Sequence, residues 1–158
     1  MVAVRPSVRA DASVIYDFVR QLAEYEKLLD EVEATEADLA QALFGPQPRV
    51  FCDIAEIEGR PVGFALWFYS YSTFRGRHGL YLEDLFVLPD ARGRGAGRAL
   101  LAGLARRCLA EGLGRLEWAV LDWNAPSIAF YDSLGAATMD DWTVRRLSGA
   151  ALNALAAE

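Results

Sequence analysis

The most informative stretch of this chain reads Leu82-Glu83-Asp84-Leu85-Phe86-Val87 and then, after a short gap, Arg92-Gly93-Arg94-Gly95-Ala96-Gly97-Arg98. The first part is a strongly apolar strand pattern that stops at Pro89-Asp90. The second part is a glycine-rich turn that leads into a helical pattern over 96–111. Glycines let the backbone approach a ligand closely, and the open amides of a helix start favour phosphate. We therefore expect a phosphate-bearing ligand at this turn, with three arginines adding positive charge.

The elements on either side of this turn predict a sheet with helices on both faces. Strand patterns cover 2–8, 49–57, 61–71, 80–88, 116–121 and 142–147, and the second and third of them read as a hairpin joined by Glu58-Gly59-Arg60. Helical spacing of apolar residues covers 11–29, 35–44, 96–111 and 124–134. This order predicts an α/β (α+β) fold that is not regularly doubly wound.

Composition narrows the class of protein. With 158 residues, 53% of them apolar, the chain fits a single folded domain over 1–158. A net charge of −6 disfavours nucleic acid as a partner and suits a cationic ligand. Cys52 and Cys108 are the only cysteines, which excludes a disulfide framework. No signal peptide or membrane span is recognisable, so we expect a cytoplasmic protein.

A glycine-rich turn alone does not identify the ligand. The dinucleotide fingerprint occupies the first unit of a parallel sheet, whereas this turn follows a hairpin. The nucleotide-binding loop of kinases and ATPases needs Lys and Ser or Thr, which are missing here. His78 is the only histidine, so a serine–histidine triad or a histidine-rich metal site has no support, and we expect no metal.

Longer matches give the turn a context. Arg92-x-x-Gly95-x-Gly97 after the strand resembles the acetyl-CoA pyrophosphate loop of the GNAT N-acetyltransferase superfamily. The resemblance runs through nearly the whole chain, and three segments are similar to the diamine (spermidine/spermine) and thialysine N-acetyltransferase branch. They are Leu22-Ala23-x-Tyr25-Glu26, Tyr81-Leu82-Glu83-Asp84 and Trp123-Asn124-x-Pro126-Ser127-Ile128-x-Phe130-Tyr131.

The resemblance implies a GNAT-like mixed, mostly antiparallel, twisted sheet and a site for acetyl-CoA. It places the pantetheine arm along the backbone of Phe86 and Val87, the pyrophosphate at 92–98, and the thioester near Asn124 and Tyr131. The cofactor-binding residues that it implies are Phe86, Val87, Arg92, Gly93, Arg94, Gly95, Ala96, Gly97, Arg98, Asn124, Ser127 and Tyr131.

The resemblance also implies roles in catalysis and substrate binding. Tyr131 would be the general acid that assists the leaving thiolate, although its spacing alone also fits a half-buried aromatic residue. Glu83 would be the base, directly or through water, that takes the proton from the amine. Glu83 and Asp84 point to opposite faces unless a bulge lies between them, and a structural ion pair is the alternative explanation. The implied substrate-binding residues are Tyr25, Glu26, Phe74, Tyr81, Glu83 and Asp84.

These observations predict an acetyl-CoA-dependent N-acetyltransferase acting on the primary amine of a small polyamine-like or lysine-like molecule, by direct attack in a ternary complex. A non-catalytic acyl-CoA-binding or sensing domain, an acetyltransferase for another amine class, and an interaction protein using a sheet edge stay open. The resemblance implies a homodimer. Polyamine-acetylating relatives carry an acid and a tryptophan where this chain has Ser72 and Phe74, which favours shorter amines.

Overall fold

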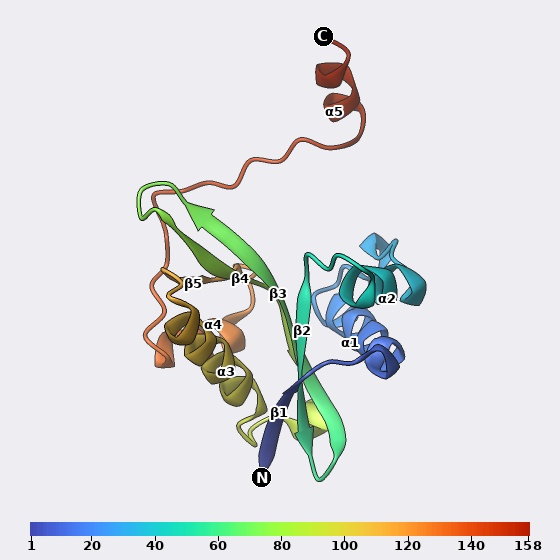
Figure 1. The fold of residues 1–158 in the computed structure, drawn as a ribbon, viewed down its shortest axis with the longest axis vertical. Coiled ribbons are helices and arrows are strands. Elements are labelled where there is room, and N and C mark those ends of the chain that lie inside the picture. Colours follow the sequence, from blue (N-terminus) through green and yellow to red (C-terminus); the bar gives the residue numbers. More distant parts are fainter. The chain divides into compact units, whose positions relative to one another are not determined.

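One sheet of five strands organises the chain, in the order β1-β2-β3-β4-β5 (Figure 1). Each of the first four strands pairs antiparallel with the next, and β5 pairs with β4 in parallel. This mixed, mostly antiparallel sheet confirms the predicted fold class. The strands are β1 (Val2–Pro6), β2 (Phe51–Ile57), β3 (Arg60–Ser72), β4 (Arg77–Val87) and β5 (Leu116–Glu117).

The computed structural model describes every residue from 1 to 158, in two compact units, 1–119 and 120–158. The first unit contains the sheet, the helices α1 (Ala12–Tyr25), α2 (Glu36–Phe44) and α3 (Ala96–Glu111), and the 3₁₀ turns Arg9–Asp11, Leu29–Glu31 and Pro89–Ala91. The second unit contains α4 (Ala125–Ser133) and α5 (Gly149–Ala156). The single domain expected from chain length stays a prediction.

Helices cover both faces of the sheet in the first unit, as Figure 1 shows. On one face, Phe18 of α1 stacks on Phe64 of β3 with ring centroids 5.7 Å apart and approaches Phe86 of β4 at 6.0 Å. On the other face, α3 buries Leu100 and Leu104 completely. Burial of these large apolar side chains on both faces fixes the positions of β3 and β4.

Local sequence signals place most of the element boundaries. Thr35 and Asp38 form the predicted capping box at the start of α2, with the Thr35 backbone N–H donating to the Asp38 carboxylate at 2.8 Å. Glu58 and Gly59 both have positive φ angles, 54° and 77°, which suit the tight turn of the β2–β3 hairpin. The predicted hairpin is therefore confirmed.

At the C-terminal end, one predicted strand is shorter than expected and another is wrong. The strand expected over 116–121 is formed only at Leu116–Glu117, and 142–147 is not a strand. A strand needs a neighbour that takes its backbone hydrogen bonds, and the register of β5 with β4 ends after two residues. The alanine-rich tail contains the helix α5.

Candidate active site

The glycine-rich turn joins β4 to α3 in a shape that leaves the first amides of the helix open. Gly93 and Gly95 have φ angles of 76° and 89°, in the left-handed region that disfavours a side chain. Gly95 caps α3, whose first turn contains no acidic residue. Ala96 packs into the core and Gly97 is half-buried in the helix. The turn therefore presents the positive end of a helix dipole to an anion such as phosphate.

The arginines of the turn lie in two different settings. Arg94 and Arg98 are exposed beside the turn. Arg92 instead folds back, and its Nε donates a hydrogen bond of 3.0 Å to the carbonyl of Val87 at the end of β4. Its guanidinium lies 5.2 Å from the ring centroid of Tyr25, the last residue of α1. Arg92 thus connects the turn to the end of α1, through a cation–π contact.

A β-bulge interrupts the pairing of β3 with β4 at Glu83. Leu66 lies opposite Asp84 and Trp67 lies opposite Leu82, which leaves Glu83 as the extra residue of the ladder. The sequence argument placed Glu83 and Asp84 on opposite faces unless a bulge was present, and the structure has one at this point. Strict alternation therefore does not separate the two carboxylates.

Beyond the bulge, β4 also has an open edge. Its parallel pairing with β5 involves only Leu80 with Leu116 and Tyr81 with Glu117. From Leu82 onward, the edge of β4 that faces away from β3 has no strand partner, and this stretch includes the backbone of Phe86 and Val87. That edge offers hydrogen-bonding groups to an extended ligand.

Two carboxylates of the first unit, Glu83 and Glu26, act on a third, Asp84. Asp84 lies on the face covered by α1, because its partner Leu66 belongs to the apolar cluster that contains Phe18. Burial first, and then the negative charges of Glu83 and Glu26, raise the pKa of Asp84 to about 7. Burial also raises the pKa of Glu26, which directly follows α1. A cation placed among these groups would lower the cost of their negative charge.

Glu83 and Asp84 have no partner among the salt bridges of the chain. The salt bridges that do form lie elsewhere, such as that of Arg5 with Asp11 at 2.7 Å.

The aromatic residues expected at the substrate lie at different distances from this cluster. Tyr81 packs its ring 5.2 Å from that of Phe68, and burial followed by the charge of Glu83 raises its pKa. Phe74 is fully exposed in the turn between β3 and β4. The length of β4 puts that turn roughly 20 Å from Asp84. The structure therefore brings Tyr81 to the carboxylates and leaves Phe74 apart from them, and the role of Phe74 stays a prediction.

The remaining candidate residues belong to the second unit, on and before α4. Asn124 caps this helix, and its side chain accepts a hydrogen bond of 3.4 Å from the backbone N–H of Ser127. Tyr131 is half-buried near the end of α4, with its ring 5.5 Å from that of Phe130. Asn124, Ser127 and Tyr131 follow the helical spacing that the sequence predicted.

Comparison with known proteins gives this arrangement a family. Residues 14–136 match the family model described as the acetyltransferase (GNAT) family, which is well over half of the chain. The chain belongs to the GNAT acetyltransferase family. The predictions of an N-acetyltransferase and of this family are confirmed.

Individual relatives agree with this membership. The acetyltransferase is 38% identical to the thialysine N-epsilon-acetyltransferase of Bos taurus over 166 residues, covering 98% of this chain and 97% of the relative. It is 29% identical to the L-ornithine N5-acetyltransferase of Arabidopsis thaliana, covering 96% of this chain and 86% of the relative. A solved integron cassette protein from the mobile metagenome of V. cholerae superposes with a TM-score of 0.81 at 27% identity, covering 99% of this chain and 98% of that one.

GNAT enzymes use acetyl-CoA, and this acetyltransferase has a turn that fits its pyrophosphate group. The fit rests on the two left-handed glycines, on the open amides at the start of α3, and on the absence of acidic residues there. No cluster of three histidine, cysteine or acidic side chains lies close enough together to hold a metal ion. None of the helices has the length and apolar character needed to cross a bilayer.

Sequence reasoning missed three features of the site. The bulge at Glu83 depends on the register with β3, and nothing in the residues of β4 signals it. The contact between Arg92 and Tyr25 joins two segments far apart in the sequence. The effect of Glu26 on Asp84 requires the end of α1 to lie near β4.

Proposed function

We propose that this chain transfers the acetyl group of acetyl-CoA to the primary amine of a small lysine-like or polyamine-like molecule. The observation that carries the proposal is the group of three carboxylates, Glu26, Glu83 and Asp84, around a bulge of β4. This strand runs into the glycine-rich turn. A cationic substrate held by the carboxylates would therefore lie along the same strand as an anionic cofactor held by the glycine-rich turn.

The chain's own residues would hold acetyl-CoA at three levels. The turn over 92–98 would bind the pyrophosphate, the open edge of β4 at Phe86 and Val87 would bind the pantetheine arm, and Asn124 with Ser127 would lie near the thioester. When bound, the cofactor supplies an activated acyl carbon. Binding along a strand edge suits the amide groups of pantetheine, because backbone donors and acceptors alternate there.

Two proton transfers accompany the reaction. The substrate ammonium first loses a proton, since only the neutral amine has a lone pair for attack. Glu83 takes this proton in our assignment, and Asp84, whose pKa of about 7 suits a base working near neutral pH, is a second acceptor. The new C–N bond then replaces the C–S bond, and Tyr131 gives its proton to the departing sulfur.

The names of the relatives favour a short amino-acid-like substrate. Thialysine N-epsilon-acetyltransferase and L-ornithine N5-acetyltransferase are both named for a nitrogen on the side chain of an amino acid. The exposed loop with Ser72 and Phe74 offers no buried carboxylate for the far end of a long polyamine. We therefore assign lysine-like amines as the preferred class, ahead of spermine.

The active form in our proposal is a homodimer in which residues 1–158 act as one acetyltransferase domain. The support is a tail whose large apolar side chains are exposed in the single chain. These are Trp142 at 77%, Val144 at 87%, Leu147 at 47%, Leu152 at 49% and Leu155 at 57% exposure. Surfaces of this kind are covered by a partner in many oligomers. Light scattering on the purified protein measures the oligomeric state, and a monomer would contradict the proposed homodimer. The cytoplasmic location stays a prediction.

One experiment tests the function. Thiol release from acetyl-CoA is measured with thialysine, lysine, ornithine, putrescine, spermidine and spermine, and the acetylated nitrogen is identified by mass spectrometry. We expect turnover with the lysine-like amines and a loss of roughly a hundredfold in kcat for Tyr131→Phe. Binding of CoA without turnover of any amine would favour the acyl-CoA-sensing alternative.

A further inference from the structure

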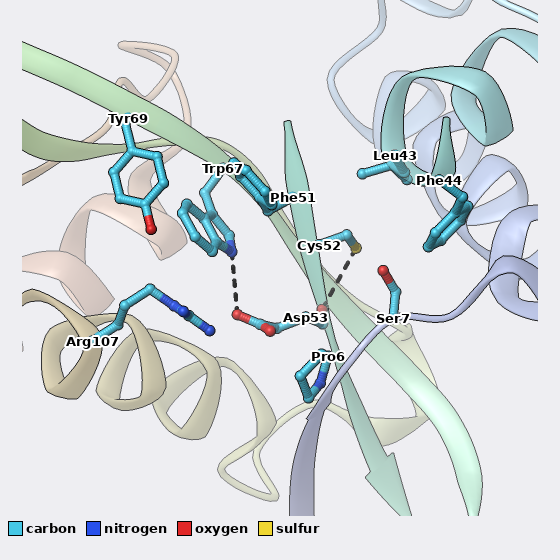
Figure 2. Close-up of a pocket in the computed structure, with 10 residues that line it drawn as sticks. All are labelled: Pro6, Ser7, Leu43, Phe44, Phe51, Cys52, Asp53, Trp67, Tyr69 and Arg107. Carbon is cyan, nitrogen blue, oxygen red and sulfur yellow. Dashed lines mark hydrogen bonds between the residues drawn. The ribbon is translucent and has the colours of Figure 1, made fainter. Parts of the chain in front are cut away.

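A cavity lies in the first unit, at the end of the sheet where β2 begins (Figure 2). Its volume is about 210 Å³. Liquid water occupies about 30 Å³ per molecule, so the space equals roughly seven waters and suits a small metabolite. The lining residues are Pro6, Ser7, Leu43, Phe44, Phe51, Cys52, Asp53, Trp67, Tyr69 and Arg107.

This cavity is separate from the glycine-rich turn. Arg107 lies eleven residues beyond the start of α3 at Ala96, and a helix rises about 1.5 Å per residue, so the two lie roughly 16 Å apart. None of the residues proposed to bind acetyl-CoA or the amine lines the cavity. The cavity therefore needs an explanation of its own.

Asp53 is the negative group of the cavity, and it is only 8% exposed. Trp67 Nε1 donates one hydrogen bond of 3.2 Å to its Oδ2, and no arginine or lysine forms an ion pair with it. A carboxylate has room for about four hydrogen bonds. Burial raises the pKa of Asp53, and Arg107 and Trp67 counteract this only in part. A donor, best a cationic one, is missing beside Asp53.

Arg107 is the positive group, and one of its donors has no acceptor. Its Nε is buried and unpaired. The guanidinium lies 4.8 Å from the ring centroid of Trp67, and its Nη1 is 3.9 Å from Glu111 Oε2, too long for a strong charged hydrogen bond. Glu111 accepts instead from the hydroxyl of Tyr69 at 2.8 Å. Glu111 is therefore a weakly held anionic partner of Arg107, and the Nε has no acceptor at all.

Apart from Ser7, Cys52 and Tyr69, the rest of the cavity wall is apolar. The ring of Phe51 stacks 4.8 Å from that of Trp67, and Leu43 and Phe44 line the side formed by α2. In Figure 2, Asp53 and Arg107 point toward the space on one side of β2, and Leu43 and Phe44 lie on the other side. A ligand that reaches both parts carries an apolar side chain as well as its charges.

We propose that this cavity binds a small apolar α-amino acid, with its ammonium on Asp53 and its carboxylate on Arg107. A simple amine would leave the Arg107 donor unpaired and would be repelled by the guanidinium. A simple carboxylate would be placed beside Asp53. Only a zwitterion offers a partner to both groups, and it does so without changing the net charge of the site. This site is independent of the acetyl-transfer site proposed above.

The test is calorimetric titration of the full chain with L-leucine and with two analogues of the same carbon skeleton. Isopentylamine lacks the carboxylate and 4-methylpentanoate lacks the ammonium. We expect L-leucine to bind more than tenfold more tightly than either analogue. Equal binding of the three ligands, or no heat from L-leucine at millimolar concentration, overturns the proposal.

Matched variants locate the binding. Asp53→Asn keeps the side-chain shape and the acceptor for Trp67, and Arg107→Met keeps the apolar stem over Trp67, so both variants should fold, which circular dichroism checks. Because each removes one charge, each should weaken the binding of L-leucine at least tenfold. Arg106→Met, at the exposed neighbouring position of α3, is the control and should bind L-leucine like the wild type. Asp84→Asn should also bind it normally. Weakening by Asp84→Asn, but not by Asp53→Asn, would place L-leucine in the acetyl-transfer site and overturn the proposal.

Discussion

Asp84 is half-buried and Asp53 is buried, both in the same sheet, yet the charges around these two carboxylates differ in sign. Burial is the largest cause of the raised pKa at both. The other contributions at Asp84 come from Glu83 and Glu26 and raise its pKa further, whereas those at Asp53 come from Arg107 and Trp67 and lower it. Burial alone therefore does not define the chemistry of a carboxylate. An all-negative surrounding suits an ammonium, and a mixed one suits a zwitterion.

The largest effect should follow from removing the charge at Asp84. We expect Asp84→Asn to lower kcat/KM for a lysine-like amine by roughly 10²–10⁴, because it removes an acceptor for the ammonium and for its proton. Steady-state kinetics measures this, with Asp17→Asn, exposed on α1, as the control. An Asp84→Asn enzyme within threefold of the wild type would show that the negative cluster is only structural.

Asp84 and Asp53 should also contribute differently to the change of stability with pH. The folded chain binds the Asp84 proton more tightly than the unfolded chain, because the pKa rises from 3.8 to about 7 on folding. The free energy of unfolding therefore falls as pH rises through this window. One pKa unit corresponds to about 1.4 kcal/mol, so Asp84→Asn should remove ~2–4 kcal/mol of this loss.

Urea unfolding between about pH 4 and pH 8 measures that difference. Asp53→Asn should flatten the same curve less, because Arg107 and Trp67 already offset part of the burial effect. An equal flattening by both variants would mean that burial alone sets the pKa of both carboxylates. The neighbouring charges would then not distinguish the two sites.

Changing one neighbour at each site should move the two pKa values in opposite directions. Glu26→Gln removes a negative charge and should lower the pKa of Asp84, whereas Arg107→Met removes a positive charge and should raise that of Asp53. Each shift should be of the order of one unit. Carboxyl NMR titration of the two aspartates measures both, and shifts of the same sign would refute the comparison.

The smallest effect should come from a charge added at Ser72, which is half-buried beside the exposed loop between β3 and β4. Ser72 ends β3, where its hydroxyl oxygen accepts a hydrogen bond of 3.2 Å from the Arg75 N–H, and the loop around it is exposed. Exposed ion pairs contribute about 0–1 kcal/mol, so Ser72→Asp should raise kcat/KM for spermine by less than about fivefold. Thialysine should hardly respond. Ser72→Asn is the uncharged control, and a larger gain would mean that spermine reaches a buried position there.

The sequence was most informative where local chemistry decides the structure. The capping box of Thr35 and Asp38, the turn at Gly59 and the glycine-rich start of α3 depend on residues close together in the chain, and all three were correctly predicted. The strand expected over 142–147 was wrong for a different reason. Its β-branched and aromatic residues favour an extended chain, but a strand exists only when another strand lies beside it.

In the candidate site, too, some features were recognisable from the sequence and others depend on the fold. The residue types of the turn and of Glu83-Asp84 were recognisable, and so was the family that they indicate. The charge state of Asp84 was not, because it depends on burial and on Glu26, far away in the sequence. The cavity at Asp53 combines residues of β2, β3 and α3, so no short motif announces it.

The open edge of β4 has a consequence for hydrogen exchange. The ladder with β5 ends at Tyr81, so backbone amides of β4 from Leu82 to Val87 that face away from β3 lack a strand acceptor. We expect such amides to exchange with deuterated water faster than those that face β3, although both belong to the same strand. Mass spectrometry of the peptides from this region should then show slower exchange when CoA is added, because the pantetheine arm proposed to lie on this edge would accept hydrogen bonds from the same amides.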